Sequence, residues 1–397
     1  MLIRKPSLII KKPSREQKEM LLTTSFFFLC LIPIGVDGLS INYLFVILPL
    51  IYFFKNQLRH PPKIVLISLF IYILVFIFSN LIFMEQHQLL IRRSTSFLIF
   101  ISVFAYAFIP ISEKMRESFE MAIVLSSLYF SMMSIFSFLT LGITDLIEAK
   151  NLIGSQRFGF VYLMAIAILF HRLYDKDRMN MLVLFSLSVL ILGLFLTLSR
   201  SSILSFIIMA ILFLLTNIFQ KSTYQLKTIL ISIMFVSSAS LAVFFLLPEV
   251  PTFFVQTLIN PLFNAELISA ASDVGSSEGI RIFRIREVLN YVSNYPILGS
   301  GFLGIWAISE TGSGSAHNQL LDTLLRVGMI GFFAYLALGI MILKYLLNFH
   351  KPLFWGLLGI LVYGLFHETF KESQGAFILA FLIGTYSQYV RKIRAQK

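Results

Sequence analysis

The chain has 397 residues, of which 57% are hydrophobic and only 13% charged, whereas soluble domains carry about 25% charged residues. Runs of about 20 apolar residues, the length that crosses a bilayer as a helix, recur throughout. This composition excludes an ordinary soluble enzyme and predicts an all-α polytopic membrane protein. The net charge of +12 does not indicate a nucleic acid partner, because cytoplasmic ends of membrane proteins are rich in cations.

Two further features bound the chemistry. Cys30 is the single cysteine and lies in an apolar run, so an internal disulfide is excluded and redox chemistry is not expected. The first twenty residues are polar and basic, without a small-residue cleavage site after the first apolar run, so we expect no cleavable signal peptide.

About twelve apolar segments follow one another as predicted transmembrane helices. Their approximate limits are 21–36, 39–54, 64–84, 95–112, 118–142, 159–172, 181–199, 202–219, 228–248, 327–348, 353–368 and 374–390. The sixth is short, and the loop 143–158 before it is a candidate re-entrant segment. The predicted organisation is a transmembrane region over 1–248 with nine helices, an external loop over 249–318 containing short helices, and a second transmembrane region over 319–397 with three.

The distribution of lysine and arginine predicts the orientation. With a cytoplasmic N-terminus, 22 of the 32 cations fall in cytoplasmic segments and 10 in external ones, as the positive-inside rule requires. Both termini are therefore predicted to be cytoplasmic. Eight of the ten external cations are arginines, whose planar guanidinium suits bidentate phosphate binding. Arg92 and Arg93, adjacent at a span edge, are interpreted as headgroup anchors.

The longest polar interruption, from Arg281 to Gly331, contains most of the candidate site residues. A helix predicted from about Ile280 to Tyr295 ends at Pro296. Its apolar face comprises Ile282, Ile285, Val288, Leu289 and Val292. Arg281 projects into that face, flanked by Arg284 and Arg286, and a buried cation requires an anion. That anion is either a structural partner, Glu278 or Asp273, or a substrate.

Two glycine-containing runs follow this helix. In P-I-L-G-S-G-F-L-G, Gly299, Gly301 and Gly304 predict a turn whose backbone approaches another group closely; without a preceding strand or a Walker lysine, the run is weak evidence for phosphate binding. In T-G-S-G-S-A-H-N-Q-L-L, Ser315 is the predicted N-cap. His317 then falls in the first helical turn, where a neutral imidazole able to accept a proton is favoured.

Four further features have alternative interpretations. Arg200, in L-S-R-S-S, is either a snorkelling end residue or a functional cation that needs a partner. Asp322 and Arg326 are four residues apart and are expected to pair. The pair His367 and Glu368 is interpreted as a cap of the eleventh span. The run Asp175-Lys176-Asp177 resembles a metal motif but lies on a predicted cytoplasmic loop, and no Cys/His spacing indicates zinc; no metal and no cofactor are expected.

The chain contains four motifs in a fixed order: S-R-S, an arginine in a long loop, P-I-L-G-S-G-F, and A-H-N-Q-L-L-D-T-L-L-R-V-G-M-I-G. This order resembles the O-antigen ligase and polymerase superfamily, which includes the Wzy-type polysaccharide polymerases. The resemblance covers roughly Leu196 to Phe332. It implies a fold similar to the GT-C membrane glycosyltransferases. It also implies action on glycans linked to undecaprenyl pyrophosphate at the outer face of the bacterial inner membrane.

The resemblance also implies roles for individual residues. The family's two recurring arginines and its histidine match Arg200, Arg281 and His317 as catalytic residues. Many members have an aromatic residue four positions after the loop arginine, but Ile285 stands there, so Arg284 remains a rival of Arg281. Arg284, the weaker family arginine Arg157, and Asn318 are the expected substrate-binding residues.

Three functions compete. The first is a Wzy-type polymerase, with O-antigen ligase as the close alternative; arginines would stabilise the leaving pyrophosphate and His317 would deprotonate the acceptor hydroxyl. The second is a transporter or flippase, which would be expected to carry ionisable residues deep in its spans or to show repeated halves. The third is a non-catalytic scaffold. The expected partners are the lipid-linked glycan and membrane lipid, with a chain-length regulator as a further candidate.

Overall fold

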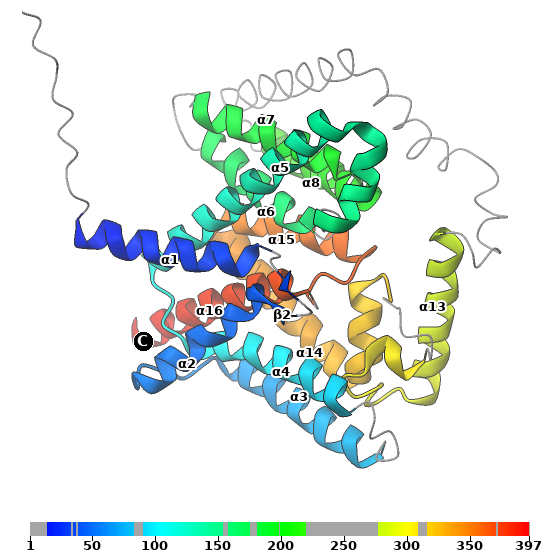
Figure 1. Cartoon of the computed structure of the whole chain (residues 1–397). Helices are drawn as coiled ribbons and strands as arrows, with labels where there is room; N and C mark the ends of the chain where they lie inside the picture. The colour runs from blue at the N-terminus through cyan, green and yellow to red at the C-terminus, as the bar shows by residue number, and fades with distance from the viewer. Residues whose placement is uncertain are drawn as a thin grey trace, which may run out of the picture.

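The computed structural model describes residues 14–32, 35–36, 39–82, 90–153, 158–174, 181–197, 199–219, 277–308, 316–370 and 372–396. Within these residues the chain is almost entirely helical, as predicted. The only strands described are β1 (Gly35–Val36) and β2 (Leu39–Ser40), a two-residue antiparallel pair in which Gly35 lies opposite Ser40. Figure 1 shows the arrangement of the elements.

The α-helices of the described residues are α1 (Arg15–Leu31), α2 (Ile47–Phe54), α3 (Lys63–Ile82), α4 (Leu90–Ala105), α5 (Glu113–Ile153), α6 (Gly159–Tyr174), α7 (Met181–Leu196), α8 (Arg200–Phe219), α13 (Ser277–Asn294), α14 (Gln319–Phe349), α15 (Lys351–Gly364) and α16 (Ser373–Gln396). Three short 3₁₀ segments join them: η1 (Ile41–Val46), η3 (Tyr106–Phe108) and η6 (Gly304–Ala307).

Three described helices are long and apolar enough to cross a membrane, namely α3, the stretch of α5 from Glu113 to Thr140, and α14. Six further apolar helices in the described residues are shorter, so the expectation of twelve spans remains a prediction. The ninth expected span, 228–248, lies outside the described residues. The loop expected at 143–158 is wrong from 143 to 153, because α5 continues to Ile153; its re-entrant character stays a prediction.

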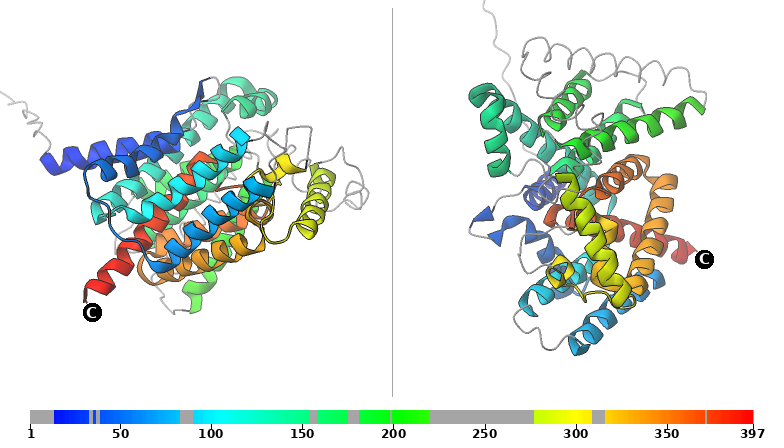
Figure 2. Two further views of the ribbon diagram at one scale, coloured as in Figure 1. Left: turned by 90° about the horizontal axis from the view of Figure 1, so that it is seen from below. Right: turned by 90° about the vertical axis from the view of Figure 1, so that its right-hand side faces the viewer.

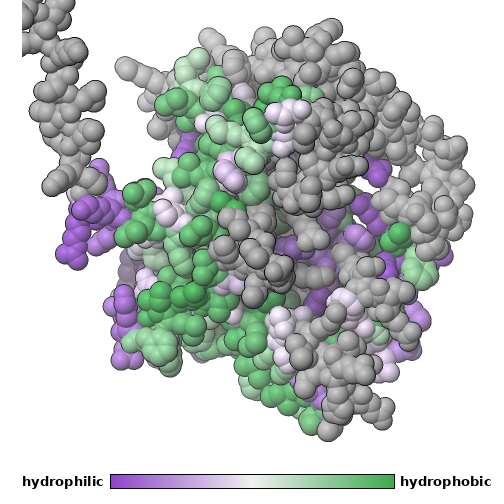
Figure 3. Space-filling model, in the orientation of Figure 1, coloured by the Kyte–Doolittle hydropathy of each residue, from purple (hydrophilic) through white to green (hydrophobic). Residues whose placement is uncertain are grey.

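Helix α6 lies at the centre of one half of the molecule. Its residues from Phe160 to Leu169 are almost fully buried, and it packs against α5, α7 and α15. In the other half α14 packs against α3. Large apolar side chains remain exposed along α3, α5, α8 and α14. Hydrophobic residues also cover much of the left-hand part of the face in Figure 3. This is the surface expected of helices that contact lipid.

Helix α13 lies across one end of the helix bundle, whereas the start of α1 and the end of α16 lie at the opposite end (Figures 1 and 2). The buried face of α13 is formed by Val288 and Val292, which pack with Ala316 and Leu325. The predicted apolar face of this helix is therefore buried at these two valines and partly buried at Ile282. Ile285 and Leu289 are exposed, by 36% and 51%, because only a narrow stripe of α13 contacts α14.

Helix α14 is kinked at Gly328, which has φ of 61° and ψ of −170°. The kink interrupts the regular backbone hydrogen bonds, and the chain at 296–302 supplies replacements. Met329 N donates to Pro296 O (2.7 Å), Ser300 N to Leu325 O (2.6 Å) and Phe302 N to Arg326 O (3.0 Å). The turn after α13 is thus fixed to the middle of α14.

Candidate active site

The segment before α14 meets the segment after α15 at the end of the bundle where α13 lies. The His317 and His367 rings have centroids 6.4 Å apart, and the His367 ring stacks on Tyr363 at 4.7 Å. The backbone N–H of Ala316 donates to the Glu368 carboxylate. The interpretation of His367 and Glu368 as a cap of the eleventh span is therefore wrong, because the two side chains contact the segment at 316–317.

Asn318, rather than Ser315, is the N-cap of α14. Its side-chain oxygen accepts from Leu320 N (2.9 Å) and Leu321 N (3.0 Å), and its Nδ2 donates to Leu365 O (2.9 Å). His317 thus precedes the helix, with φ of 50°, and the prediction that it lies in the first turn is wrong. Ser315 itself lies outside the described residues. Asn318 positions His317 by binding both α14 and the end of α15.

Arg281 lies near the N-terminus of α13, and its side chain is partly buried. Its positive charge lowers the pKa of His367. The inward direction of Arg281 stays a prediction. The side chains of Glu278 and Asp273, its candidate structural anions, lie outside the described residues.

Arg284 has an internal partner. Its NH1 donates to Glu287 Oε2 at 2.7 Å, and the two side chains are exposed by only 12% and 23%. Arg286 is exposed. The spacing of Arg284 and Glu287, three residues apart on a helix, is the sequence signal for this pair. Of the three arginines of α13, Arg281 is the one whose positive charge acts on His367.

The start of α8 contributes a hydroxyl-rich edge. Arg200 is the first residue of α8 and is exposed. The hydroxyl of Ser199 lies 3.1 Å from that of Ser201 and accepts a hydrogen bond from Ser202 N at 3.4 Å. Arg200 is therefore the cation next to this group of serines.

The charge environment keeps His367 neutral. Burial, the positive charge of Arg281 and the neighbouring His317 lower its pKa from 6.5 to about 4. At neutral pH this imidazole can donate and accept hydrogen bonds but carries no charge. The site thus combines a cation, Arg281, with a neutral imidazole, His367, beside His317.

The glycine turn approaches protein rather than an open site. A Cβ at Gly299 (φ 59°) would lie 2.4 Å from Leu325 O, and one at Gly301 (φ 59°) would lie 2.0 Å from Ser79 Oγ. The predicted close backbone approach is confirmed, and its target is α14 and α3. Phe302 follows with φ of 78° and is fully buried among aromatic rings of α3 and α4.

Two buried arginines lie beside this turn. Arg326 binds Asp322 Oδ2 through Nε (2.7 Å) and Phe302 O through NH1 (2.8 Å), which confirms the expected pair. Arg93 is only 2% exposed, and its NH1 donates to Asn80 Oδ1 (2.8 Å). The interpretation of Arg93 as a headgroup anchor is wrong, because its guanidinium is directed into the protein. The side chain of Arg92 lies outside the described residues.

Three sequence features fall outside the described residues: Arg157, the run 175–177 and the glycine-serine segment 312–315. Within the residues that the structure describes, no group of three or more His, Cys, Asp or Glu side chains has the arrangement of a metal site.

The fold and the site define a class, namely a helical membrane protein with arginine and histidine side chains gathered at one end of the bundle. A family model described as O-antigen ligase matches residues 185–336, the stretch of the chain that runs from α7 into α14. The match confirms the resemblance to the O-antigen ligase and polymerase superfamily and supports, in broad terms, a ligase- or polymerase-type function. No curated protein matches the sequence.

Proposed function

We propose that the protein is a Wzy-type polymerase, which transfers glycan repeat units between intermediates linked to undecaprenyl pyrophosphate. The observation that carries the proposal is the meeting of Arg281, His317 and His367. They come from three segments and gather beside α13, at the end of the bundle away from the described termini. The reaction would take place at the outer face of the bacterial plasma membrane, in O-antigen or capsule synthesis.

The transfer breaks the bond between the anomeric carbon of the donor glycan and its pyrophosphate. Negative charge develops on the leaving pyrophosphate, and preorganised cations at that position lower the barrier. Arg281 is the first candidate for this role, with Arg200 as the second cation. The internal pair of Arg284 with Glu287 makes Arg284 the weaker candidate. Arg157 remains a candidate substrate ligand.

The new glycosidic bond forms when a hydroxyl of the acceptor sugar attacks the anomeric carbon. The hydroxyl proton passes to a general base, for which we propose His317, since an imidazole titrates near neutral pH. The neutral ring of His367 lies beside it and suits a role in positioning. Asn318 holds His317 through its bonds to α14 and to Leu365 O, so we assign Asn318 to positioning rather than to direct substrate binding.

O-antigen ligase is the second candidate, because the matching family model carries that description. A ligase uses one lipid-linked donor and transfers its glycan to a lipid A core, which is anionic. Outside the segment 249–318, the predicted external cations are few and scattered: Arg92, Arg93, Lys150, Arg157, Arg200, Arg326 and Lys371. The structure buries Arg93 and pairs Arg326, which removes two of them from an acceptor surface and favours the polymerase.

Deletion of the gene in a Gram-negative host separates the two. Loss of a polymerase leaves lipopolysaccharide capped by a single repeat unit, without a ladder on a gel. Loss of a ligase leaves a core without any repeat unit, while long polymer accumulates on the lipid carrier. His317→Ala should reproduce the deletion with normal protein levels in the membrane. A normal ladder in that variant would contradict the proposed base.

A further inference from the structure

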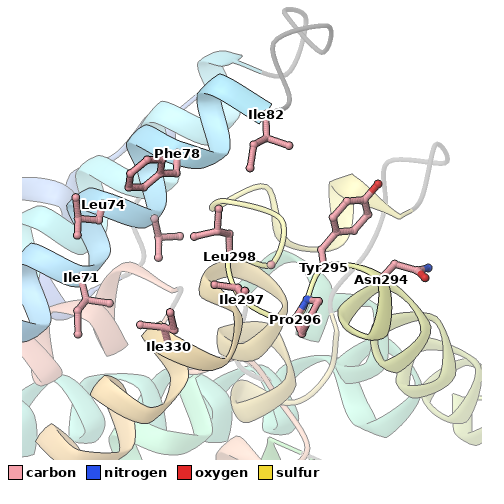
Figure 4. A pocket seen from close by; sticks show the side chains of 12 residues that line it. Ile71, Leu74, Phe78, Ile82, Asn294, Tyr295, Pro296, Ile297, Leu298 and Ile330 are labelled. Atoms are coloured by element: carbon pink, nitrogen blue, oxygen red, sulfur yellow. The ribbon is translucent and has the colours of Figure 1, made fainter.

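An apolar groove of about 470 Å³ lies between α3 and the turn that follows α13. Figure 4 shows its two walls. One wall is formed by α3 from Ile71 to Ile82. The other is formed by Tyr295, by the turn from Pro296 to Gly299 and by Ile330 just after the kink of α14. Because Met329 N bonds to Pro296 O at 2.7 Å, this second wall is fixed to α14.

The groove is suited to a hydrocarbon chain that enters from the bilayer. Its walls carry large apolar side chains that are about half exposed, among them Phe78 (48%), Ile297 (58%) and Ile330 (49%). The lining of α3 extends over twelve residues, from Ile71 to Ile82, about 16 Å along a helix axis, and α3 is one of the helices long enough to span a membrane. The groove therefore runs along the outer half of that span.

The end of the groove near α13 is polar. Asn294 and Tyr295 lie there, and the ring of Tyr295 contacts that of Tyr291 at 5.0 Å. The charge of Arg93 acts on Tyr291, and Arg93 binds Asn80, two residues before Ile82 on α3. A cation thus stands behind the polar end of an apolar channel, an arrangement that complements a lipid with an anionic headgroup.

The distance between Arg281 and the groove indicates which of the two lipid-linked substrates, donor or acceptor, fits the groove. Thirteen residues of α13 separate Arg281 from Asn294, which is about 20 Å along the helix axis. The donor reacts at the sugar attached directly to its pyrophosphate, so its tail must begin beside Arg281. The acceptor reacts at a hydroxyl that the rest of its repeat unit separates from its own pyrophosphate. Its tail must therefore begin about one short oligosaccharide away from the reaction centre, as this groove does.

We propose that the groove between α3 and the turn at 296–299 holds the polyprenyl tail of the acceptor substrate, a lipid-linked repeat unit. This inference rests on the proposed function, because a polymerase requires a second lipid-linked substrate. The groove fixes the acceptor lipid at one end of α13 while the donor pyrophosphate is bound at the other. The repeat unit then extends along α13 toward His317.

The test uses the full-length protein in nanodiscs and two defined substrates. The donor is a polyprenyl-pyrophosphate-linked repeat unit whose acceptor hydroxyl is blocked, so that it can only donate. The acceptors carry the same glycan on either a long polyprenyl tail or a short, water-soluble alkyl chain. In the variant Ile330→Trp the larger ring fills the groove. The variant Phe333→Trp, on the same helix and outside the groove, is the matched control.

The wild type and Phe333→Trp should use the long-tailed acceptor with a higher kcat/KM than the short-chain acceptor. Ile330→Trp should lower kcat/KM for the long-tailed acceptor by about tenfold, as expected when several buried methylene groups lose their contacts. Its rate with the short-chain acceptor and its KM for the donor should stay within about twofold of the wild type, a change of only a few tenths of a kcal/mol.

Three outcomes overturn the inference. If wild-type protein joins the substrates but shows no preference for the long tail, the groove proposal fails and the polymerase survives. If Ile330→Trp raises the KM of the donor instead, the groove holds the donor tail. If the wild type makes no product with either acceptor but transfers the donor glycan to a lipid A core, the proposed polymerase fails, and the acceptor groove fails with it.

Discussion

The imidazole rings of His317 and His367 lie 6.4 Å apart, centroid to centroid, although fifty residues separate them in the chain. Helices α14 and α15 run between them as a packed hairpin. Two hydrogen bonds fix the ends of this hairpin to each other, from Ala316 N to Glu368 and from Asn318 to Leu365 O. The geometry of one histidine therefore depends on both segments.

The arginines of α13 give the most direct test of the site. Arg281→Lys keeps the positive charge but loses the planar guanidinium that binds two phosphate oxygens at once. We expect a loss of activity of at least about a hundredfold, comparable to removal of one transition-state donor. The loss of activity is measured as polymer formation on lipopolysaccharide gels, normalised to the protein level in the membrane.

Arg286→Lys is the matched control, because Arg286 lies on the same helix and is exposed. We expect normal ladders from this variant. Arg284→Lys should have an intermediate effect, since lysine keeps the charge pair with Glu287 but loses the geometry of the 2.7 Å bond. Equal, mild effects at all three positions would show that Arg281 is not a phosphate ligand.

The glycine turn is expected to act through stability. Gly299→Ala places a Cβ 2.4 Å from Leu325 O at a φ of 59°, so the turn must move away from α14, and the protein should lose thermal stability and accumulate poorly. Gly339→Ala is the control, because a Cβ there meets nothing within 4 Å. A stable Gly299→Ala protein that had lost only substrate binding would instead indicate a phosphate-binding turn.

The buried pair of Asp322 and Arg326 should be sensitive to single changes. Both side chains are at most 3% exposed, and removing one partner of a buried pair costs about 3–5 kcal/mol because an uncompensated charge remains. Asp322→Leu should therefore greatly reduce the amount of folded protein. The double variant Asp322→Leu with Arg326→Met should recover some of it. Fluorescence size-exclusion chromatography of detergent-solubilised protein would measure the amount of folded protein for the single and the double variant. No recovery in the double variant would contradict the view that Asp322 and Arg326 stabilise the fold mainly through each other.

The orientation predicted from lysine and arginine counts has its own test. Both termini should be cytoplasmic and the segment 249–318 external. Alkaline phosphatase fused after Gln256 or Gly312 should be active, because that enzyme forms its disulfides outside the cytoplasm. A fusion at the C-terminus should be inactive. An inactive fusion at either loop position would place the Arg281 region on the cytoplasmic side and refute the proposed function.

Periodicity and length predicted most of the helices, because apolar runs bounded by polar residues define where a helix meets the membrane surface. The continuation of α5 to Ile153 and the kink of α14 at Gly328 were not predictable in this way. The kink depends on hydrogen bonds from the turn at 296–302, which meets Gly328 only once the chain has folded. The expected role of the glycines in close approach was correct, but their partner could not be identified from local sequence.

The candidate site, like the fold, was predictable from local sequence only in part. The motif around His317 and the arginines of α13 are visible as local patterns. The contribution of His367 and the burial of Arg93 were not, because each depends on a contact with a remote helix. The sequence signal for His367 as a site residue was its position at the predicted polar end of a span. That position is equally typical of a residue that caps a helix.

The pKa of His367 predicts how stability changes with pH. Burial and Arg281 lower that pKa from 6.5 to about 4, whereas the ring in the unfolded chain titrates near 6.5. Between these two values the unfolded state binds more protons than the native state, so the free energy of unfolding falls as the pH falls. His367→Gln removes this contribution. Its melting temperature should therefore decrease less than that of the wild type between pH 7 and pH 5, as measured in thermal scans of the purified protein. His60→Gln, at an exposed position, should follow the wild type. Parallel curves for wild type and His367→Gln would show that His367 is not held neutral by its surroundings.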